Sequence, residues 1–218
     1  MNQVTMVYKN AHPGFTLVEM AVVLVIVGLL LAGLLIPLSA QIDQRNYSDA
    51  QKAMNDIKDA LFGYAMSRPA GNYLPCPDIN GDGIEDRLGT GCNNVDGNVP
   101  WATLGTPATD SWGNRYQYRV TSTFADSGTG FNLLSLGNIT ILDASGGNTV
   151  AAAVPAVVIS KGVNNAGAGL DEQENSDLDA TFVSHTRSGA SANEFDDLVV
   201  WISPAILFSR MVSAGKLP

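Results

Sequence analysis

The stretch Gly14-Phe15-Thr16-Leu17-Val18-Glu19 opens onto a long apolar run, in which residues 20–42 carry no charged side chain. About 20 apolar residues in a helix are enough to cross the hydrocarbon core of a bilayer. A charge at the centre of a spanning helix costs roughly 2.5–3.5 kcal/mol, so an ionisable residue there suggests a function. Glu19 is therefore either a functional carboxylate at the start of this helix or the interfacial end of an ordinary anchor.

A secretory signal peptide is a second explanation of the apolar run. The small-residue stretch Leu38-Ser39-Ala40, which precedes Gln41, faintly resembles a signal-peptide cleavage site. The run is longer than the apolar region of about 7–15 residues that signal peptides use, and Glu19 is misplaced for one. The pattern favours a membrane anchor that the protein keeps.

Gly14, Phe15 and Glu19, followed by the apolar run, resemble the processing site of type IV prepilins and type II secretion pseudopilins. In that family a membrane peptidase cuts after the glycine and N-methylates the new terminal phenylalanine. The resemblance implies a leader over residues 1–14 and a mature chain that begins at Phe15. It also implies two kinds of partner, prepilin peptidase and other pilin or pseudopilin subunits. The leader is long for the family, and a start at Met6 would give a more typical nine-residue leader.

Cleavage after Gly14 would place an ammonium group on Phe15, one helical turn from Glu19. A carboxylate in the first turn also faces the positive end of the helix dipole. The pair can form within one subunit. In a pilin filament, the resemblance implies that Glu19 neutralises the terminal amine of a neighbouring subunit and so sets the register of assembly.

The helix is expected to run from Phe15 to about Ser67, because apolar residues recur at helical spacing beyond the membrane. The resemblance then implies a pilin-like α+β fold, in which a long N-terminal helix packs on an antiparallel β-sheet with irregular loops. The protein is expected in the inner membrane as a single-pass protein with a periplasmic globular domain, which would lie outside the cell in a pilus. The expected parts are a leader at 1–14, the transmembrane half of the helix at 15–40, its amphipathic half at 41–68 and an exported β-rich domain at 69–218.

The exported domain contains several candidate strands and a closing helix. Pro204 is suited to begin that helix and Gly215 to end it. The turn around Trp112, between Asp110 and Tyr116, resembles a turn in the major pseudopilin of type II secretion. Patterning predicts strands over Arg115–Thr121, Phe131–Leu136, Ile139–Leu142, Ala156–Ser160 and Leu198–Ser203.

Cys76 and Cys92 are the two cysteines of the chain, and both lie in the expected exported domain, where disulfides persist. A bridge between them would close a loop of about 15 residues and contribute about 3 kcal/mol in the chain-entropy model. Two cysteines and His185 cannot complete a structural zinc shell. We therefore predict a Cys76–Cys92 disulfide.

The loop between the cysteines resembles the start of a calcium-binding loop, in which alternating oxygen side chains converge on one ion and a glycine permits the sharp turn. Position twelve is Gly89, so the bidentate glutamate of a complete EF-hand is missing. The loop is either a truncated Ca²⁺ site or an acidic, turn-rich segment. The candidate ligands are Asp78, Asn80, Asp82, the carbonyl of Ile84, and Asp86.

A second acidic stretch spans Asp171 to Asp179. Its placement resembles the C-terminal calcium loop of major pseudopilins, but its spacing differs, and a flexible charged loop is the favoured interpretation. Asp196 and Asp197 precede the last predicted strand, where they either reach one of the acidic loops or face water.

The sequence contains no pattern typical of a catalytic site. It lacks a Gly-x-Ser-x-Gly elbow, a phosphate-binding glycine loop and a His-Glu-x-x-His helix. The formal net charge of −9, with scattered basic residues, argues against a nucleic-acid partner. We expect a non-enzymatic subunit of a type IV pilus or a type II secretion pseudopilus. The alternative is a membrane-anchored calcium- or glycan-binding module that does not polymerise.

Overall fold

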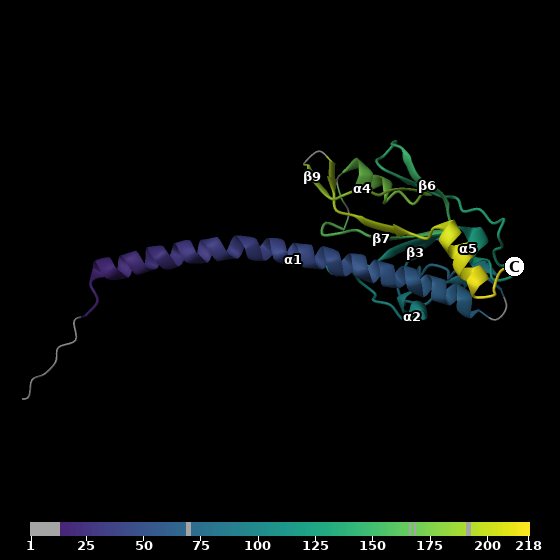
Figure 1. Ribbon diagram of the computed structural model, residues 1–218, viewed down its shortest axis with the longest axis horizontal. Helices are drawn as coiled ribbons and strands as arrows, with labels where there is room; N and C mark the ends of the chain where they lie inside the picture. Colours follow the sequence, from purple (N-terminus) through teal and green to yellow (C-terminus); the bar gives the residue numbers. More distant parts are fainter. Residues whose placement is uncertain (1–13, 69–70, 166, 168, 191–192) are drawn as a thin grey trace, which may run out of the picture. The chain divides into compact units, whose positions relative to one another are not determined.

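The computed structural model (Figure 1) describes residues 14–68, 71–165, 167, 169–190 and 193–218, without the side chains of 32–40 and 190. Apart from Gly14, the expected leader lies outside the described residues. The chain divides into two compact units, Met1–Arg45 and Asn46–Pro218. It has an α+β fold, in which a long N-terminal helix contacts mainly antiparallel sheets.

The N-terminal helix α1 spans Leu17–Ser67, a length of 51 residues, and so confirms the predicted long helix. In the first unit its apolar side chains are exposed on every side of the helix from Leu17 to Leu31. Among the residues that the structure describes, none of the helices combines the length and the hydropathy of a membrane span. The predicted transmembrane half, 15–40, includes the residues whose side chains are not described.

In the second unit α1 buries the apolar stripe that helical spacing predicts. Its residues recur every three or four positions, so they lie on one face of the helix. Phe62, which lies between two members of the stripe, is also buried. The buried members of the predicted stripe are Ala50, Met54, Ile57, Leu61, Tyr64 and Ala65.

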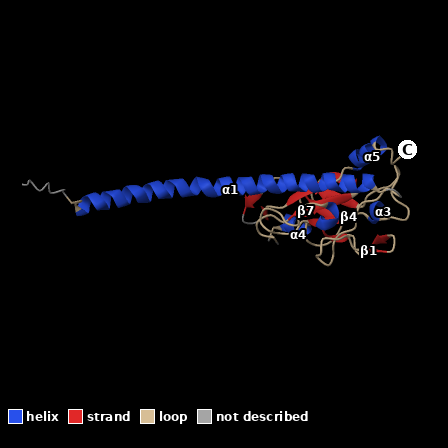
Figure 2. Cartoon of the chain, turned by 90° about the horizontal axis from the view of Figure 1, so that it is seen from below, coloured by secondary structure: helices blue, strands red, loops and turns tan. Residues whose placement is uncertain are grey.

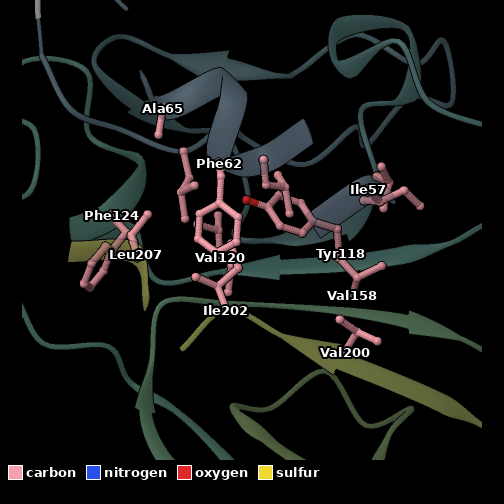
Figure 3. Close-up of a cluster of buried hydrophobic side chains, with 14 of the residues drawn as sticks. Ile57, Phe62, Ala65, Tyr118, Val120, Phe124, Val158, Val200, Ile202 and Leu207 are labelled. Atoms are coloured by element: carbon pink, nitrogen blue, oxygen red, sulfur yellow. The ribbon is translucent and has the colours of Figure 1, made fainter. Parts of the chain in front are cut away.

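This face of α1 packs on a four-stranded antiparallel sheet whose strand order is β11-β7-β4-β3 (Figure 2). In Figure 3, Ile57 and Phe62 of the helix lie opposite Tyr118, Val120 and Val158 of the sheet. The main core of the second unit therefore lies between α1 and this sheet. The strands are β3 (Asp96–Asn98), β4 (Gln117–Val120), β7 (Ala156–Ser160) and β11 (Leu198–Trp201).

The strand predicted at Ala156–Ser160 is present as the central strand β7, which is buried on both faces. Ala156 and Val158 belong to the core under α1, whereas Val157 and Ile159 belong to a second apolar cluster. That cluster is completed by a three-stranded sheet, in which β5 pairs antiparallel with β6 and parallel with β8. The strands of this sheet are β5 (Ile139–Leu142), β6 (Thr149–Val154) and β8 (Thr181–Val183).

The remaining elements are short, except for the C-terminal helix α5 (Pro204–Ser213). Pro204 lies in its first turn and Gly215 follows its end at φ 66°, as predicted. Two hairpins and three short helices complete the unit. They are β1 (Arg87–Leu88) with β2 (Gly91–Cys92), β9 (Ser188–Ala190) with β10 (Asn193–Phe195), α2 (Trp101–Leu104), α3 (Ser122–Ala125) and α4 (Leu170–Glu174).

The predicted strand at Phe131–Leu136 is wrong, because this segment forms a turn. The Leu134 N–H donates to the Asn132 side-chain oxygen at 2.8 Å, and the Ser135 N–H donates to the Asn132 carbonyl at 3.0 Å. Asn132 thus offers the backbone local acceptors that compete with strand pairing. The strands predicted at Arg115–Thr121 and Leu198–Ser203 exist but are shorter, as β4 and β11.

Candidate functional site

The N-terminal segment places Thr16 and Glu19 in a reciprocal cap at the start of α1. The Glu19 carboxylate accepts hydrogen bonds from the Thr16 N–H at 2.8 Å and from its hydroxyl at 2.9 Å. The Glu19 N–H donates to the Thr16 hydroxyl at 3.2 Å. This is a capping box, which satisfies backbone donors that a helix start otherwise leaves unpaired. It holds the Glu19 carboxylate at the positive end of the helix.

Gly14 and Phe15 lie immediately before this cap, and both are exposed. The Phe15 side chain is 83% exposed. The predicted processing residues are thus adjacent to the ordered start of α1, and their roles stay predictions.

The predicted pairing of Cys76 and Cys92 is present as a disulfide with a Cα–Cα distance of 5.2 Å. Glu85, between them in sequence, ties this loop to α1. Its carboxylate accepts hydrogen bonds from the Tyr64 hydroxyl at 2.5 Å and from the Cys76 N–H at 3.0 Å, and it pairs with Arg87 at 3.0 Å. Burial and the neighbouring Glu85 carboxylate raise the pKa of the Tyr64 hydroxyl. The network fixes the disulfide loop on the last turns of the helix.

The loop predicted to bind calcium is held by its own side chains. The buried Asp78 carboxylate accepts the N–H groups of Gly81 at 2.6 Å and of Gly83 at 2.9 Å. Gly83 has a φ of 83°, and a Cβ there would lie 2.4 Å from the Trp101 ring. Packing against Trp101 and the backbone conformation therefore both require a glycine at this position.

The other candidate ligands make similar local bonds. The Asn80 oxygen accepts the Asp82 N–H at 2.9 Å, Asp82 accepts the Ile84 N–H at 2.8 Å, and Asp86 accepts the Ile79 N–H at 2.7 Å. In the described part of the chain, the two groups of acidic residues close enough to share an ion do not include these residues. Calcium binding by this loop stays a prediction.

The turn around Trp112 anchors the end of β7. The Asp110 carboxylate accepts the N–H groups of Trp112 at 3.0 Å and Asn114 at 2.8 Å, and the Ser160 hydroxyl at 2.6 Å. The Asn114 amide donates to the Gly162 carbonyl at 2.7 Å. The turn thus positions the residues that follow β7.

The end of β7 lies beside a pair of buried acids because of the sheet register. Leu198 of β11 pairs with Ser160 of β7 in antiparallel fashion. The residues before Leu198, Asp197 and Asp196, therefore lie beside the residues after Ser160, Lys161 and Gly162. A Cβ at Gly162 would lie 2.4 Å from the Asp196 carboxylate oxygen Oδ1, which confirms how closely the two segments approach.

The short helix α4 adds a third acid to this pair. Glu172 accepts the Asp196 N–H at 2.9 Å, and all three carboxylate side chains are buried. One oxygen from each of Glu172, Asp196 and Asp197 lies within 4.8 Å of the others. We call these three residues the acidic cluster. The sequence left open whether Asp196 and Asp197 face water, and the structure shows that Asp196 reaches the second acidic loop.

Lys161 is the basic side chain buried nearest this cluster in the described residues. Its ammonium donates to the Asn175 carbonyl at 2.9 Å and to the Ser176 hydroxyl. Burial lowers the pKa of Lys161, although the carboxylates of Asp197 and Glu172 oppose that shift. One ammonium group therefore accompanies three carboxyl groups.

The buried environment of the acidic cluster disfavours the charged forms of its two aspartates. Burial raises the pKa of Asp197 to about 6, against the opposing hydrogen bond from Asn175 and the charge of Lys161. Burial likewise raises the pKa of Asp196. Desolvation disfavours the charged form of a carboxyl group, and neighbouring carboxylates add to that effect. Three oxygen ligands at this spacing could hold a metal ion.

Sequence reasoning did not find Glu172 as a partner of Asp196 and Asp197. The available signal was the position of the two aspartates between apolar residues, Phe195 and Leu198, where a solvated acidic pair is unexpected. A second acidic group, formed by Glu174, Asp177 and Asp179, is largely exposed.

Comparison with known proteins identifies a motif in the N-terminal segment of the chain. No curated protein and no solved structure matches it significantly. The family model for the prokaryotic N-terminal methylation motif matches residues 9–35, a range that contains Gly14, Phe15, Glu19 and the start of α1. The protein therefore carries a prepilin-type cleavage and methylation motif at residues 9–35.

Proposed function

We propose that the protein is a pilin-like structural subunit of a type IV pilus or a type II secretion pseudopilus. Prepilin peptidase cuts between Gly14 and Phe15, and the mature chain assembles through its N-terminal helix. The observation that carries this proposal is the methylation motif at residues 9–35, in register with the start of the 51-residue helix α1. The motif indicates a structural rather than an enzymatic role.

The environment of Gly14 supports processing at this position. A Cβ at Gly14 would meet no heavy atom within 4 Å, and the residue has no left-handed φ. Neither packing nor backbone conformation therefore requires a glycine here. A peptidase that accepts only a small residue before the scissile bond supplies a reason for it.

The exposed apolar helix supports a role in a membrane and then in a filament. The motif implies an N-terminal membrane-anchoring helix and a domain outside the cytoplasm. A helix that is hydrophobic on every side is stable when lipid or other helices surround it. We place the precursor in the inner membrane with its globular domain in the periplasm, and the mature helix among those of neighbouring subunits.

Glu19 is proposed as the assembly residue. In the precursor its carboxylate is satisfied by the Thr16 N–H and hydroxyl. Cleavage gives Phe15 a positive amine. In the low dielectric of a helix bundle, that amine and the carboxylate are costly unless each has a charged partner. Pairing with the amine of a neighbouring subunit supplies one and fixes the axial register.

Processing is tested by producing the full chain with and without active prepilin peptidase. Intact mass measurement is expected to show loss of residues 1–14 and addition of one methyl group at Phe15. Gly14→Leu should remain uncut, whereas Gly28→Leu, a matched change farther along the helix, should be processed normally. A chain that keeps its first 14 residues beside an active peptidase would contradict the proposal.

Assembly is tested separately with Glu19→Gln and with Asp56→Asn as the exposed control on the same helix. The wild type and the control should sediment as filaments, whereas processed Glu19→Gln should stay in the membrane fraction. If processed wild type never polymerises, the protein is instead a membrane-anchored binding module. If Glu19→Gln assembles like the wild type, Glu19 is not the assembly residue.

Calcium is the cofactor that we propose for the globular domain. Two places could supply its oxygen ligands, the loop from Asp78 to Asp86 and the acidic cluster. Carboxylate and carbonyl oxygens are the ligands that Ca²⁺ prefers.

A further inference from the structure

We infer that the second unit binds a neutral saccharide in a hollow between the hairpin β1–β2, the helix α3 and the turn that follows Phe131. The hollow has a volume of about 440 Å³. Pockets for small molecules typically have volumes of about 300–1,000 Å³, so the hollow is large enough for such a ligand. The inference is independent of processing, of filament assembly and of calcium binding.

The lining of the hollow is polar. It consists of two glycines and six side chains that form hydrogen bonds, four of them hydroxyl groups, and no apolar side chain is among the described residues that line it. Hydroxyl groups both donate and accept hydrogen bonds, so this lining suits a ligand that also does both at many positions. A saccharide is such a ligand. The polar lining residues are Ser122, Thr123, Asp126, Thr129, Asn132 and Ser135.

Asp126 carries the only charge among the described residues that line the hollow. Its carboxylate accepts the Gly128 N–H at 2.8 Å and the Thr129 hydroxyl at 3.0 Å. These two hydrogen bonds, that from Gly128 first, lower the pKa of Asp126, so the group is ionised at neutral pH. Each oxygen keeps a lone pair for a ligand hydroxyl, and hydrogen bonds to an ionised acceptor are the stronger ones. The same charge repels an anionic ligand, which leaves neutral ligands favoured.

Two donors in the lining are not used by the fold. The exposed Ser122 hydroxyl and the Asn132 side-chain nitrogen donate to no residue within the described part of the chain. Asn132 is nevertheless held in place, because its side-chain oxygen accepts the Leu134 N–H at 2.8 Å and its N–H donates to the Ser135 hydroxyl at 3.0 Å. A ligand can therefore bond to these donors without breaking internal hydrogen bonds, and groups fixed in advance lose less entropy on binding.

The turn that contributes Asn132 and Ser135 also presents leucines beside the hollow. Leu134 is 88% exposed and Leu136 is 74% exposed. The rings of saccharides have apolar C–H faces as well as hydroxyl groups at their edges. Leucine methyl groups can cover such a face while the polar lining bonds to the hydroxyl groups, so the turn and the hollow together match both parts of the ligand.

A peptide fits the hollow less well than a saccharide. Extended peptides are usually bound by adding a strand to a free sheet edge, and amphipathic helices by an apolar groove. The helix α3 and the turn after Phe131 offer no strand edge. In the neighbouring hairpin, the Thr90 carbonyl already accepts the Ser127 N–H at 2.8 Å and the Ser127 hydroxyl at 3.0 Å. The polar lining also provides no apolar groove for a helix.

The test titrates the full chain in a calorimeter, in a zwitterionic detergent, because a detergent with a sugar headgroup would compete for the site. The probes are glucose, galactose, N-acetylglucosamine and the disaccharides cellobiose, lactose and N,N′-diacetylchitobiose. At least one of these should bind with one molecule per chain and millimolar affinity. Asp126→Asn should weaken that binding about tenfold, because it removes a charged acceptor. Ser122→Ala should weaken it about threefold and leave the thermal unfolding midpoint unchanged, because this hydroxyl makes no internal bond.

Each variant has a matched control outside the hollow. Asp143→Asn changes an exposed carboxylate whose pKa is likewise lowered by local hydrogen bonds, from Asn148, and Ser209→Ala removes an exposed hydroxyl from α5. Both controls should keep the affinity of the wild type. If Asp126→Asn does not fold, Ser122→Ala decides the location by itself.

Three outcomes would overturn the proposal. The first is the absence of heat with every one of these sugars, and the second is sugar binding that survives both Asp126→Asn and Ser122→Ala. The third is binding of putrescine in place of the sugars, which would assign the hollow to a cationic ligand. Because uncut chain in detergent is sufficient, none of these outcomes bears on the proposed processing and assembly.

Discussion

The two units of the chain use apolar residues in opposite ways. In the unit that ends at Arg45, apolar helical residues are exposed on all sides, as Leu24 is at 71% and Leu29 at 70%. In the unit that begins at Asn46, the same helix confines its apolar residues to one face, and Leu61 is fully buried. A helix that is apolar on every side requires a partner beyond its own fold, whereas a stripe is covered within the fold.

Because of this difference, we expect the second unit to determine the stability of the fold and the first unit to determine assembly. The second unit has its own cores, a disulfide and buried ionisable groups, so substitutions there should change its free energy of unfolding. Substitutions in the first unit should leave that free energy almost unchanged and act on insertion or association instead.

The largest expected effect compares the same substitution in the two parts of α1. Leu61→Ala removes a fully buried side chain between the helix and the sheet and should lower the free energy of unfolding by about 2–5 kcal/mol. Leu24→Ala should change it by less than about 0.5 kcal/mol, because that side chain is exposed. Denaturant unfolding of both variants in detergent, followed by tryptophan fluorescence, measures the difference. Equal losses of stability would refute the separation of the two units.

A smaller effect concerns the pH dependence of the second unit. Burial raises the pKa of Asp197 from 3.8 to about 6, so the folded state binds this proton more tightly than the unfolded state. In chelator-treated protein, Asp197 should therefore add up to about 3 kcal/mol of stability as pH falls from 7 to 4. Asp197→Asn should abolish this gain.

Denaturant unfolding across this pH range, performed on wild type and Asp197→Asn, isolates the contribution. Asp171 works in the opposite direction: burial raises its pKa, but hydrogen bonds from Ser145, Asn193 and His185 outweigh burial and lower it. Its stabilising effect is lost as pH falls, and it is common to both proteins. Parallel pH profiles for the two proteins would show that Asp197 does not titrate as proposed.

The smallest effect concerns an exposed ion pair between α5 and α1. Arg210 donates to Asp59 at 2.8 Å, and the two side chains are 44% and 60% exposed. Asp59→Asn should lower the free energy of unfolding by only about 0.2–1 kcal/mol, because water and salt screen exposed ion pairs. Thermal unfolding at low and high salt measures it, with Asp56→Asn as the control. A cost that persists at high salt would mean that the pair acts through packing.

Local signals in the sequence account for much of the fold. The helical recurrence from Ala50 to Ala65 predicted the buried face of α1, and the mainly apolar segment Ala156–Ser160 predicted the strand β7, although not its burial on both faces. The buried face follows from the period of the helix, and the strand follows from a short apolar, β-branched segment, so each signal lies within one segment. The error at Phe131–Leu136 arose because Asn132 offers local hydrogen bonds that hydrophobic patterning does not reveal.

The candidate metal sites show the limit of such reasoning. The loop from Asp78 to Asp86 was predicted to bind calcium because its candidate ligands alternate along one short segment, yet its oxygens bond mainly to its own backbone. The acidic cluster draws on two segments more than 20 residues apart in sequence, at Glu172 and at Asp196 and Asp197. No spacing rule links these segments.

The sequence by itself determined the helix, the methylation motif that begins it, the pairing of two lone cysteines and the presence of a strand at Ala156–Ser160. The helix, the motif and the strand each depend on residues that are close in sequence, and two cysteines can pair with each other in only one way. Only the tertiary structure decided that Asp196 and Asp197 are buried beside Lys161 and Glu172. That outcome depends on the register of β11 against β7 and on the position of α4, which arise from contacts between distant segments.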